Sequence, residues 1–289
     1  MLTRQKVLLT ILETAGRSVG RIELMKWCFL LRHESCSRGG SAFYDFVPDR
    51  LGPFSFGLYQ EIGKLRDWSY IVDSGEQAWR YNPTIVPPGS GIGLALEREV
   101  RGIVSRFSHL SSDQLLDYVY ERHPQYTVNS VRCQLATRHR ADAAVYTAGY
   151  EGISIDRFFN LLVKAGIARL IDVRSNPVSR RYGFHKSTLD RLATSLGIDY
   201  IHLPELGIRS EQRRLHPADG GRDSLFADYE ATTLIEESDT LTRLAGLVRE
   251  DASVLVCMEA DPRCCHRGRL AHPISAMTGL PIVHLRAEP

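Results

Sequence analysis

VYTAGYEGISIDRFFNLLVKAGIARLIDVR, residues 145–174, contains two short apolar runs with a helical stretch between them. VYTAG and LIDVR have the length and composition of buried strands, whereas ISIDRFFNLLVKAG has the spacing of an amphipathic helix. The alternation continues to the C-terminus through KSTLDRLATSLG, YIHL, SDTLTRLAGLVRE, SVLVCM, GRLAHPISAMTG and PIVHL. Apolar strands that alternate with helices indicate a parallel sheet covered on both faces. Residues 141–289 are therefore predicted to form a Rossmann-like α/β domain.

The first 140 residues have a different pattern, in which helical spacing predominates. Two apolar helical faces fall within residues 3–33, separated by the turn-like AGRSVGR, and a third amphipathic helix is expected at about 56–67. A short β-hairpin is expected around Ser74 and Gly75. Three small helices followed by a hairpin predict a winged-helix-like domain over residues 1–140, for which we expect DNA binding. A small α+β packing module has the same pattern and remains an alternative.

The remainder of this half connects the two predicted domains. Residues 84–93 (TIVPPGSGIG) are rich in Pro and Gly and indicate a loop. Two further helices are expected at about 94–107 and 112–122, the second with Ser111 or Ser112 as its N-cap. RHRADAA, near 138–144, is the expected linker.

Composition limits the class of protein. A chain of 289 residues with 43% hydrophobic and 24% charged residues is typical of a globular protein of one or two domains. No apolar run approaches the roughly 20 residues that span a bilayer, and the N-terminal stretch predicts a helix and not a signal peptide. The six cysteines form no repeating framework, which favours reduced thiols. We therefore expect a cytoplasmic protein without a membrane partner, and a homodimer is compatible with this composition.

The charge is distributed unevenly between the two halves. Net charge is only +2, but residues 1–140 carry 18 Lys and Arg against 14 Asp and Glu, whereas the remainder carries 18 against 20. The mild basic excess of the first half is where a nucleic-acid partner would be expected to bind.

Polar residues follow four successive strands of the predicted sheet. Ligands of an open parallel sheet bind beyond the carboxyl ends of its strands, so these side chains are expected to line one cleft. The candidate site residues are Tyr150 after the first strand, Asp172, Arg174, Ser175, Asn176, Ser179, Arg180 and Arg181 after the second, Glu205 after the third, and Glu259, His266 and Arg267 after the fourth.

Four motifs of this half occur together in one order: YTAGYEGISIDRFFNLL, IDVRSNPVSRRYGF, YIHLPELG and CMEADPRCCHRGRLA. Over about residues 145–285 they resemble the DUF488 family. The resemblance implies a compact α/β fold and no defined chemistry. The segment around Phe46–Phe56 resembles small helical N-terminal modules attached to such domains and to antitoxin-like proteins.

Two thiol chemistries are considered for CMEADPRCCHRGRLA. A zinc site would use Cys257, Cys264, Cys265 and His266, but the adjacent Cys-Cys-His residues are not expected to converge on one ion, and no second Cys-x2-Cys pair exists. Cys257 and Arg263 have the Cys-x5-Arg spacing of anion-holding thiol loops. That loop would contain two acids and a proline, which add negative charge and remove a donor. We expect no metal and no cofactor, and mostly structural thiols.

An anion or nucleotide site is favoured over both. His266 and Arg267 begin a helix, whose free N–H groups and dipole attract negative groups. Arg174, Arg180 and Arg181 are able to add bidentate phosphate contacts, and Tyr150 is able to stack on a base or sugar. Pairing of Asp172 and Glu259 with these arginines is the structural alternative.

These residues together predict a nucleic-acid-associated enzyme. In this hypothesis Asp172 or Glu259 activates water, and the arginines hold phosphate. His266 serves either as an acid or as an orienting residue. The substrate would be a nucleotide or a modified base in DNA, in a hydrolase or glycosylase reaction of repair or phage defence. The alternative is a DNA-binding regulator or defence sensor whose α/β domain binds a nucleotide without turning it over. Either hypothesis makes DNA or a nucleotide the partner.

Overall fold

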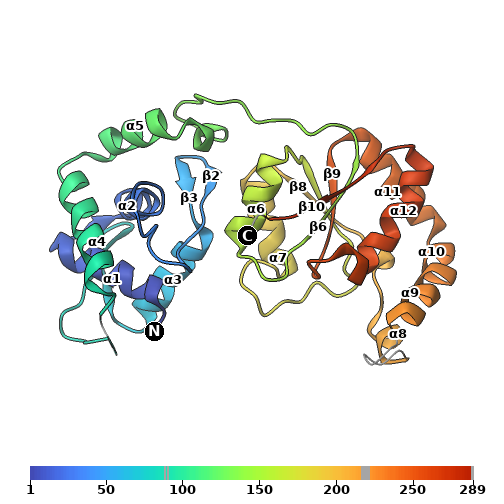
Figure 1. Cartoon of the computed structure of the whole chain (residues 1–289), viewed down its shortest axis with the longest axis horizontal. Helices are drawn as coiled ribbons and strands as arrows, with labels where there is room; N and C mark the ends of the chain where they lie inside the picture. Colours follow the sequence, from blue (N-terminus) through green and yellow to red (C-terminus); the bar gives the residue numbers. More distant parts are fainter. Residues whose placement is uncertain (88, 90, 216–221, 288–289) are drawn as a thin grey trace. The chain divides into compact units, whose positions relative to one another are not determined.

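The chain divides into two compact units, residues 1–137 and 138–289. The computed structural model describes residues 1–87, 89, 91–215 and 222–287 (Figure 1). Two residues of the expected 84–93 loop, Pro88 and Ser90, lie outside these ranges.

Hydrogen bonds locate the boundary between the two units along the chain. The backbone N–H of Leu135 donates to Thr127 Oγ1 of the first unit. Arg138 donates through its guanidinium to the carbonyl oxygens of Ile167 and Leu196 in the second unit. The expected linker 138–144 therefore begins with a residue that is anchored to the second unit.

The first unit contains helices, a small sheet and a separate hairpin. Its elements are α1 (Thr3–Ala15), β1 (Val19–Gly20), α2 (Arg21–Glu34), β2 (Val47–Asp49), β3 (Gly52–Phe54), α3 (Phe56–Asp67), β4 (Ile71–Asp73), β5 (Ala78–Tyr81), α4 (Leu94–Phe107), α5 (Ser112–Arg122) and the 3-10 helix η1 (Pro124–Thr127).

Local sequence explains where two of these helices begin. Ser55 Oγ accepts a hydrogen bond from the backbone N–H of Leu58 at the start of α3. Ser111 Oγ accepts from the N–H of Gln114 at 3.2 Å, and Gln114 Oε1 accepts in return from the N–H of Ser111 at 2.9 Å. This reciprocal capping box satisfies N–H groups that the first turn of α5 leaves without helical partners.

Three of the strands form an antiparallel sheet in the order β1-β5-β4. Val19 lies opposite Trp79, and Asp73 is opposite Trp79 on the other side of β5. Among the described residues, β2 and β3 pair only with each other. The expected hairpin around Ser74 and Gly75 is thus the β4–β5 connection, with a third strand contributed from between α1 and α2.

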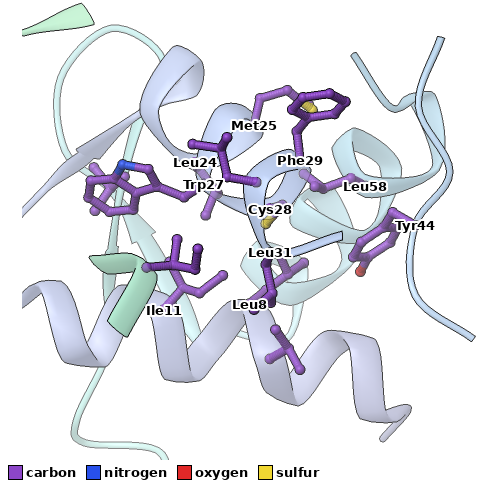
Figure 2. Packing of buried hydrophobic residues seen from close by; sticks show 14 of the residues in the cluster. Leu8, Ile11, Leu24, Met25, Trp27, Cys28, Phe29, Leu31, Tyr44 and Leu58 are labelled. Carbon is purple, nitrogen blue, oxygen red and sulfur yellow. The ribbon is translucent and has the colours of Figure 1, made fainter. Parts of the chain in front are cut away.

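A continuous apolar core holds the first unit together. Figure 2 shows Leu8 and Ile11 of α1 directed into the same space as Leu24 and Leu31 of α2. Trp27 of α2 is fully buried in this core. Burying a leucine or isoleucine side chain contributes about 1.5–3 kcal/mol, so packing between α1 and α2 supplies much of the unit's stability.

Lys26 is a charged exception on the same helix. It is 2% exposed, and its Nζ donates to the carbonyl oxygens of Leu51 at 2.6 Å and Pro53 at 2.8 Å. These carbonyls belong to the turn and second strand of the β2–β3 hairpin. Burial lowers the pKa of Lys26 to about 7.

The second unit alternates strands with helices, as predicted. Its elements are β6 (Val145–Gly149), α6 (Ile155–Lys164), β7 (Arg169–Asp172), α7 (Lys186–Ser195), β8 (Asp199–His202), η2 (Pro204–Leu206), α8 (Ser210–Leu215), α9 (Arg222–Ala231), α10 (Thr233–Glu236), α11 (Ser238–Glu250), β9 (Ser253–Cys257), η3 (Pro262–Cys264), α12 (His266–Thr278) and β10 (Ile282–Leu285).

These strands form a five-stranded, wholly parallel sheet in the order β10-β6-β9-β7-β8. Helices α6 and α7 lie on one side of it and α11 and α12 on the other (Figure 1). Val145, Ile171 and Leu255 share a buried cluster with residues of α11 and α12. The predicted parallel sheet with two covered faces is confirmed, and its central strand is β9.

No helix in the described part of the chain has the length and apolar character needed to cross a membrane.

Candidate functional site

The carboxyl ends of the strands bring the candidate residues to one edge of the sheet. Gly149 at the end of β6 lies beside Cys257 at the end of β9, and Asp172 at the end of β7 lies beside His202 at the end of β8. Asp172 is also paired with Val256, the residue before Cys257. The segments that follow these strands therefore start from neighbouring positions.

Asp172 and Arg174 form a buried ion pair at this edge. Arg174 Nε donates to Asp172 Oδ1 at 2.7 Å, and Arg174 Nη2 donates to Oδ2 at 2.5 Å. Tyr200 Oη also donates to Oδ2, at 2.8 Å. Asp172 is 0% exposed and Arg174 is 6% exposed. Burial alone would lower the pKa of Arg174, but the hydrogen bonds to Asp172 raise it above its ordinary value. The pair matches the structural alternative considered for these two residues.

Tyr150 is enclosed by the same group. Its hydroxyl accepts from Arg174 Nη1 at 2.8 Å, and its ring stacks on Phe184 with centroids 4.1 Å apart. The Arg174 guanidinium carbon lies 5.2 Å from the centroid of the Tyr150 ring. Tyr150 is 4% exposed, so its ring packs against Phe184 and Arg174.

Two thiols and an imidazole lie close together at the end of β9. One ligand atom from each of Cys257, Cys265 and His266 lies within 4.8 Å of the others, and all three residues are buried. Cys257 Sγ is 3.7 Å from His266 Nδ1. Of the adjacent residues Cys264, Cys265 and His266, the last two join Cys257 in this cluster and Cys264 does not. Cys265 is the extended N-cap of α12 and His266 is its first helical residue, so both side chains turn toward β9.

Glu259 lies at the outer side of this cluster and is half-buried. Its Oε2 accepts from Cys257 Sγ at 3.3 Å. Burial alone would raise the pKa of Glu259, but hydrogen bonds from Cys265, from its own backbone and from Cys257 lower it below its ordinary value. The carboxylate is therefore ionised at neutral pH and is able to accept a proton or a hydrogen bond.

Arg267 holds the segment that carries Glu259. Its guanidinium donates to the backbone carbonyl of Glu259 and, at 3.0 Å, to that of Ala260. A Cβ built on Gly149 would collide with the Glu259 carbonyl and with Arg267 Nη2. A glycine is therefore required at the end of β6, and Arg267, which is 1% exposed, contacts protein backbone.

The remaining candidates lie further out. Asn176, Arg180, Arg181 and Glu205 are exposed, whereas Ser175 and Ser179 are partly buried. Arg181 Nη1 is 3.4 Å from the carbonyl oxygen of Tyr150, which attaches the loop after β7 to the end of β6.

Residues 154–274 match the family model described as Domain of unknown function DUF488. The second unit carries a DUF488 domain. This match confirms the resemblance for the C-terminal part of the chain, and no family model supports the N-terminal module. No curated protein and no solved structure matches the chain.

Sequence reasoning missed two tyrosines that contact the DUF488 site residues. Tyr200 donates to Asp172, and the Tyr229 ring lies 5.7 Å from the His266 ring in an edge-on arrangement. Tyr200 lies on a strand in the quoted YIHL motif, which was a usable signal. Tyr229 lies on α9, a helix that was not expected, so nothing in the sequence indicated its contact.

Proposed function

We propose that the protein is a nucleic-acid-associated hydrolase whose DUF488 domain acts on a nucleotide or on a modified base in DNA. The observation that carries this proposal is the half-buried, ionised Glu259 above a buried cluster of two thiols and an imidazole. A scaffold carboxylate is usually paired with a cation, as Asp172 is with Arg174. Glu259 instead accepts from thiols, which leaves it suited to orient a water molecule.

Charge on the surrounding loops supports a phosphate-bearing substrate. The loop after β7 carries the exposed cations Arg180 and Arg181, and α7 begins at the exposed Lys186. The segment after β8 adds the exposed Arg209 and Arg213. Arginines bind phosphate through paired N–H groups, so these two segments are suited to hold the backbone of a nucleotide or of a nucleic acid.

The first unit supports association with DNA through its topology. A winged helix places a strand between its first two helices and pairs that strand with its hairpin. The first unit has β1 between α1 and α2 and pairs it with β5 of the β4–β5 hairpin, and it carries the additional β2–β3 hairpin between α2 and α3. The helix before the hairpin is α3, whose outer face carries the exposed Tyr59 and Arg66. We propose α3 as the DNA-contacting helix and repair or phage defence as the setting.

The enclosed state of Asp172, Arg174 and Tyr150 favours a second candidate function. A sensor that holds a nucleotide without turning it over needs the cationic loops but no acid–base residue. The three residues contact one another, so they are less suited to catalysis than the sequence suggested. In this candidate Glu259 has no catalytic role.

A substrate screen with matched variants separates the two functions. The full chain is incubated with free nucleotides, RNA, and DNA containing modified or damaged bases, and released products are measured by mass spectrometry. Glu259→Gln is expected to lower the rate by about 10²–10⁴-fold, the range for loss of a general base. Asp261→Asn removes a nearby acid that pairs with Arg263 and is expected to leave the rate unchanged. Nucleotide binding without product from any substrate would favour the sensor.

A further inference from the structure

We propose that Cys257, Cys265 and His266 form a zinc site with an open fourth position next to Glu259. The three ligand atoms lie within 4.8 Å of one another. A tetrahedral zinc ion with bonds of about 2.0–2.3 Å separates its ligand atoms by about 3.5–3.8 Å. The 3.7 Å between Cys257 Sγ and His266 Nδ1 already has this value, and the other separations need small side-chain rotations.

The hydrogen bonding of His266 prepares Nδ1 to act as a ligand. His266 Nε2 lies 3.0 Å from the carbonyl oxygen of Val173. A carbonyl oxygen only accepts hydrogen bonds, so Nε2 carries the proton and Nδ1 keeps its lone pair in the neutral ring. Zinc-bound histidines almost always donate their other ring N–H to a carbonyl, a carboxylate or water in this way.

The ligand set selects the metal. Two thiolates and one imidazole are soft and borderline ligands, which favour zinc over the hard cations Mg²⁺ and Ca²⁺. The ligands come from both sides of the β9–α12 connection, with Cys257 at the end of the strand and Cys265 and His266 at the start of the helix. A bound ion would therefore cross-link this connection.

Glu259 determines what the fourth position holds. Its Oε2 lies 3.3 Å from Cys257 Sγ, so it is adjacent to an ion bound by that sulfur. Three protein ligands and one open position are typical of catalytic zinc, whose bound water ionises more readily than free water. Zinc here would supply Lewis-acid activation of a water at the open position, and Glu259 would orient that water. Only this last role depends on the proposed function, because zinc binding itself does not require a substrate.

Metal content and cobalt spectroscopy test the site without an activity assay. Zinc is measured by mass spectrometry in the purified full chain, and about one ion per chain is expected for a single site of this kind. Replacement by Co²⁺ is expected to give the visible bands of a tetrahedral site and the near-ultraviolet band of thiolate coordination. Cys257→Ser and Cys265→Ser are expected to lose the bound zinc and the cobalt bands. Cys264→Ser, which changes the adjacent thiol outside the cluster, is expected to keep the zinc and the cobalt bands.

Two results would overturn the zinc site. One is a wild-type chain that, after incubation with excess zinc or Co²⁺, retains no metal on gel filtration and has no thiolate–cobalt band. The other is equal loss of metal from the Cys264→Ser and Cys265→Ser variants. If a serine variant does not fold, the wild-type cobalt spectrum still decides, since its thiolate band requires cysteine ligands. A metal-loaded chain that turns over no substrate counts against the proposed hydrolase and not against the site.

Discussion

Asp172 is the most enclosed acid among the candidate residues. Its two carboxylate oxygens accept buried hydrogen bonds from Arg174 and a partly buried one from Tyr200. The charge on Asp172 therefore compensates a guanidinium that is itself buried, and the two charges cannot be separated without cost. Its place beside the end of β9 is compatible with a supporting role for the site.

We expect Asp172→Asn to destabilise the DUF488 domain by about 3–5 kcal/mol, because it leaves the Arg174 charge buried and uncompensated. Unfolding in urea, followed by circular dichroism, measures this change. Asp261→Asn is the matched control, since Asp261 pairs with the exposed Arg263 and its loss is expected to change stability much less. Equal midpoints for the two variants would show that the buried pair does not stabilise the fold.

Among the elements, the β2–β3 hairpin depends on a side chain from another element. Lys26 of α2 donates to two of its carbonyl oxygens. Burial lowers the pKa of Lys26 to about 7, whereas the unfolded chain has the ordinary value near 10.5. Between these two values the unfolded state binds more protons than the folded state, so the free energy of unfolding rises as pH increases through this range.

We therefore expect the contribution of Lys26 to raise the free energy of unfolding of the first unit between pH 7 and pH 9. Lys26→Met removes the ionisable group at similar length and should flatten this slope. The measurement is urea unfolding at several pH values with tryptophan fluorescence, which reports on the first unit because all three tryptophans lie in it. Lys64→Met changes a more exposed lysine on α3 and should keep the wild-type slope. A steep slope that survives Lys26→Met would assign the effect to another group.

The sequence predicted those elements whose pattern is local. VYTAG, LIDVR, YIHL, SVLVCM and PIVHL overlap all five strands of the parallel sheet, because each is an apolar run between helices. Helix starts with a serine cap were equally readable, as Ser111 shows. The strand β1 was not predicted, since two residues have no periodicity and Val19 is in a strand only because Trp79 lies opposite.

The site was predictable as a location but not as a set of roles. The rule that ligands bind beyond parallel strands brought the right segments together. It did not reveal that Arg174 turns back to Asp172, or that Cys265 and His266 both face Cys257. These outcomes depend on side-chain directions set by the packed fold, which spacing along the chain does not contain.

At the scale of the whole molecule, two units with different chemistry share one chain. The DUF488 domain holds the thiols, the imidazole and Glu259, whereas the basic excess is in the first half. Under the proposed function, the first unit brings the protein to a nucleic acid and the second unit acts on it. These proposed roles predict that the first unit contributes to nucleic-acid binding, which can be measured.

We expect the full chain to bind duplex DNA weakly and with a steep dependence on salt, because counterions are released as phosphates are neutralised. Replacing both Lys64 and Arg66 of α3 with alanine should weaken binding and lower the salt slope by about 2, one for each lost phosphate contact. Fluorescence anisotropy over a range of salt concentrations measures both quantities. Arg101→Ala on α4, which removes a cation paired with Glu97, serves as the control. Binding that responds equally to both changes would argue against α3 as the contact.

The strand order of the second unit has a consequence for how the protein is made. β6 pairs with β9 and β10 but not with β7, which is next in the chain. On the ribosome, β6 therefore waits without a partner until residues 150–252 have been synthesised. At about 5–20 residues per second this synthesis takes about 5–20 seconds, during which an apolar strand with two open edges is a template for aggregation. A stop codon shortly before Ser253 would leave a gap at the centre of the sheet, so even late truncations should yield insoluble protein.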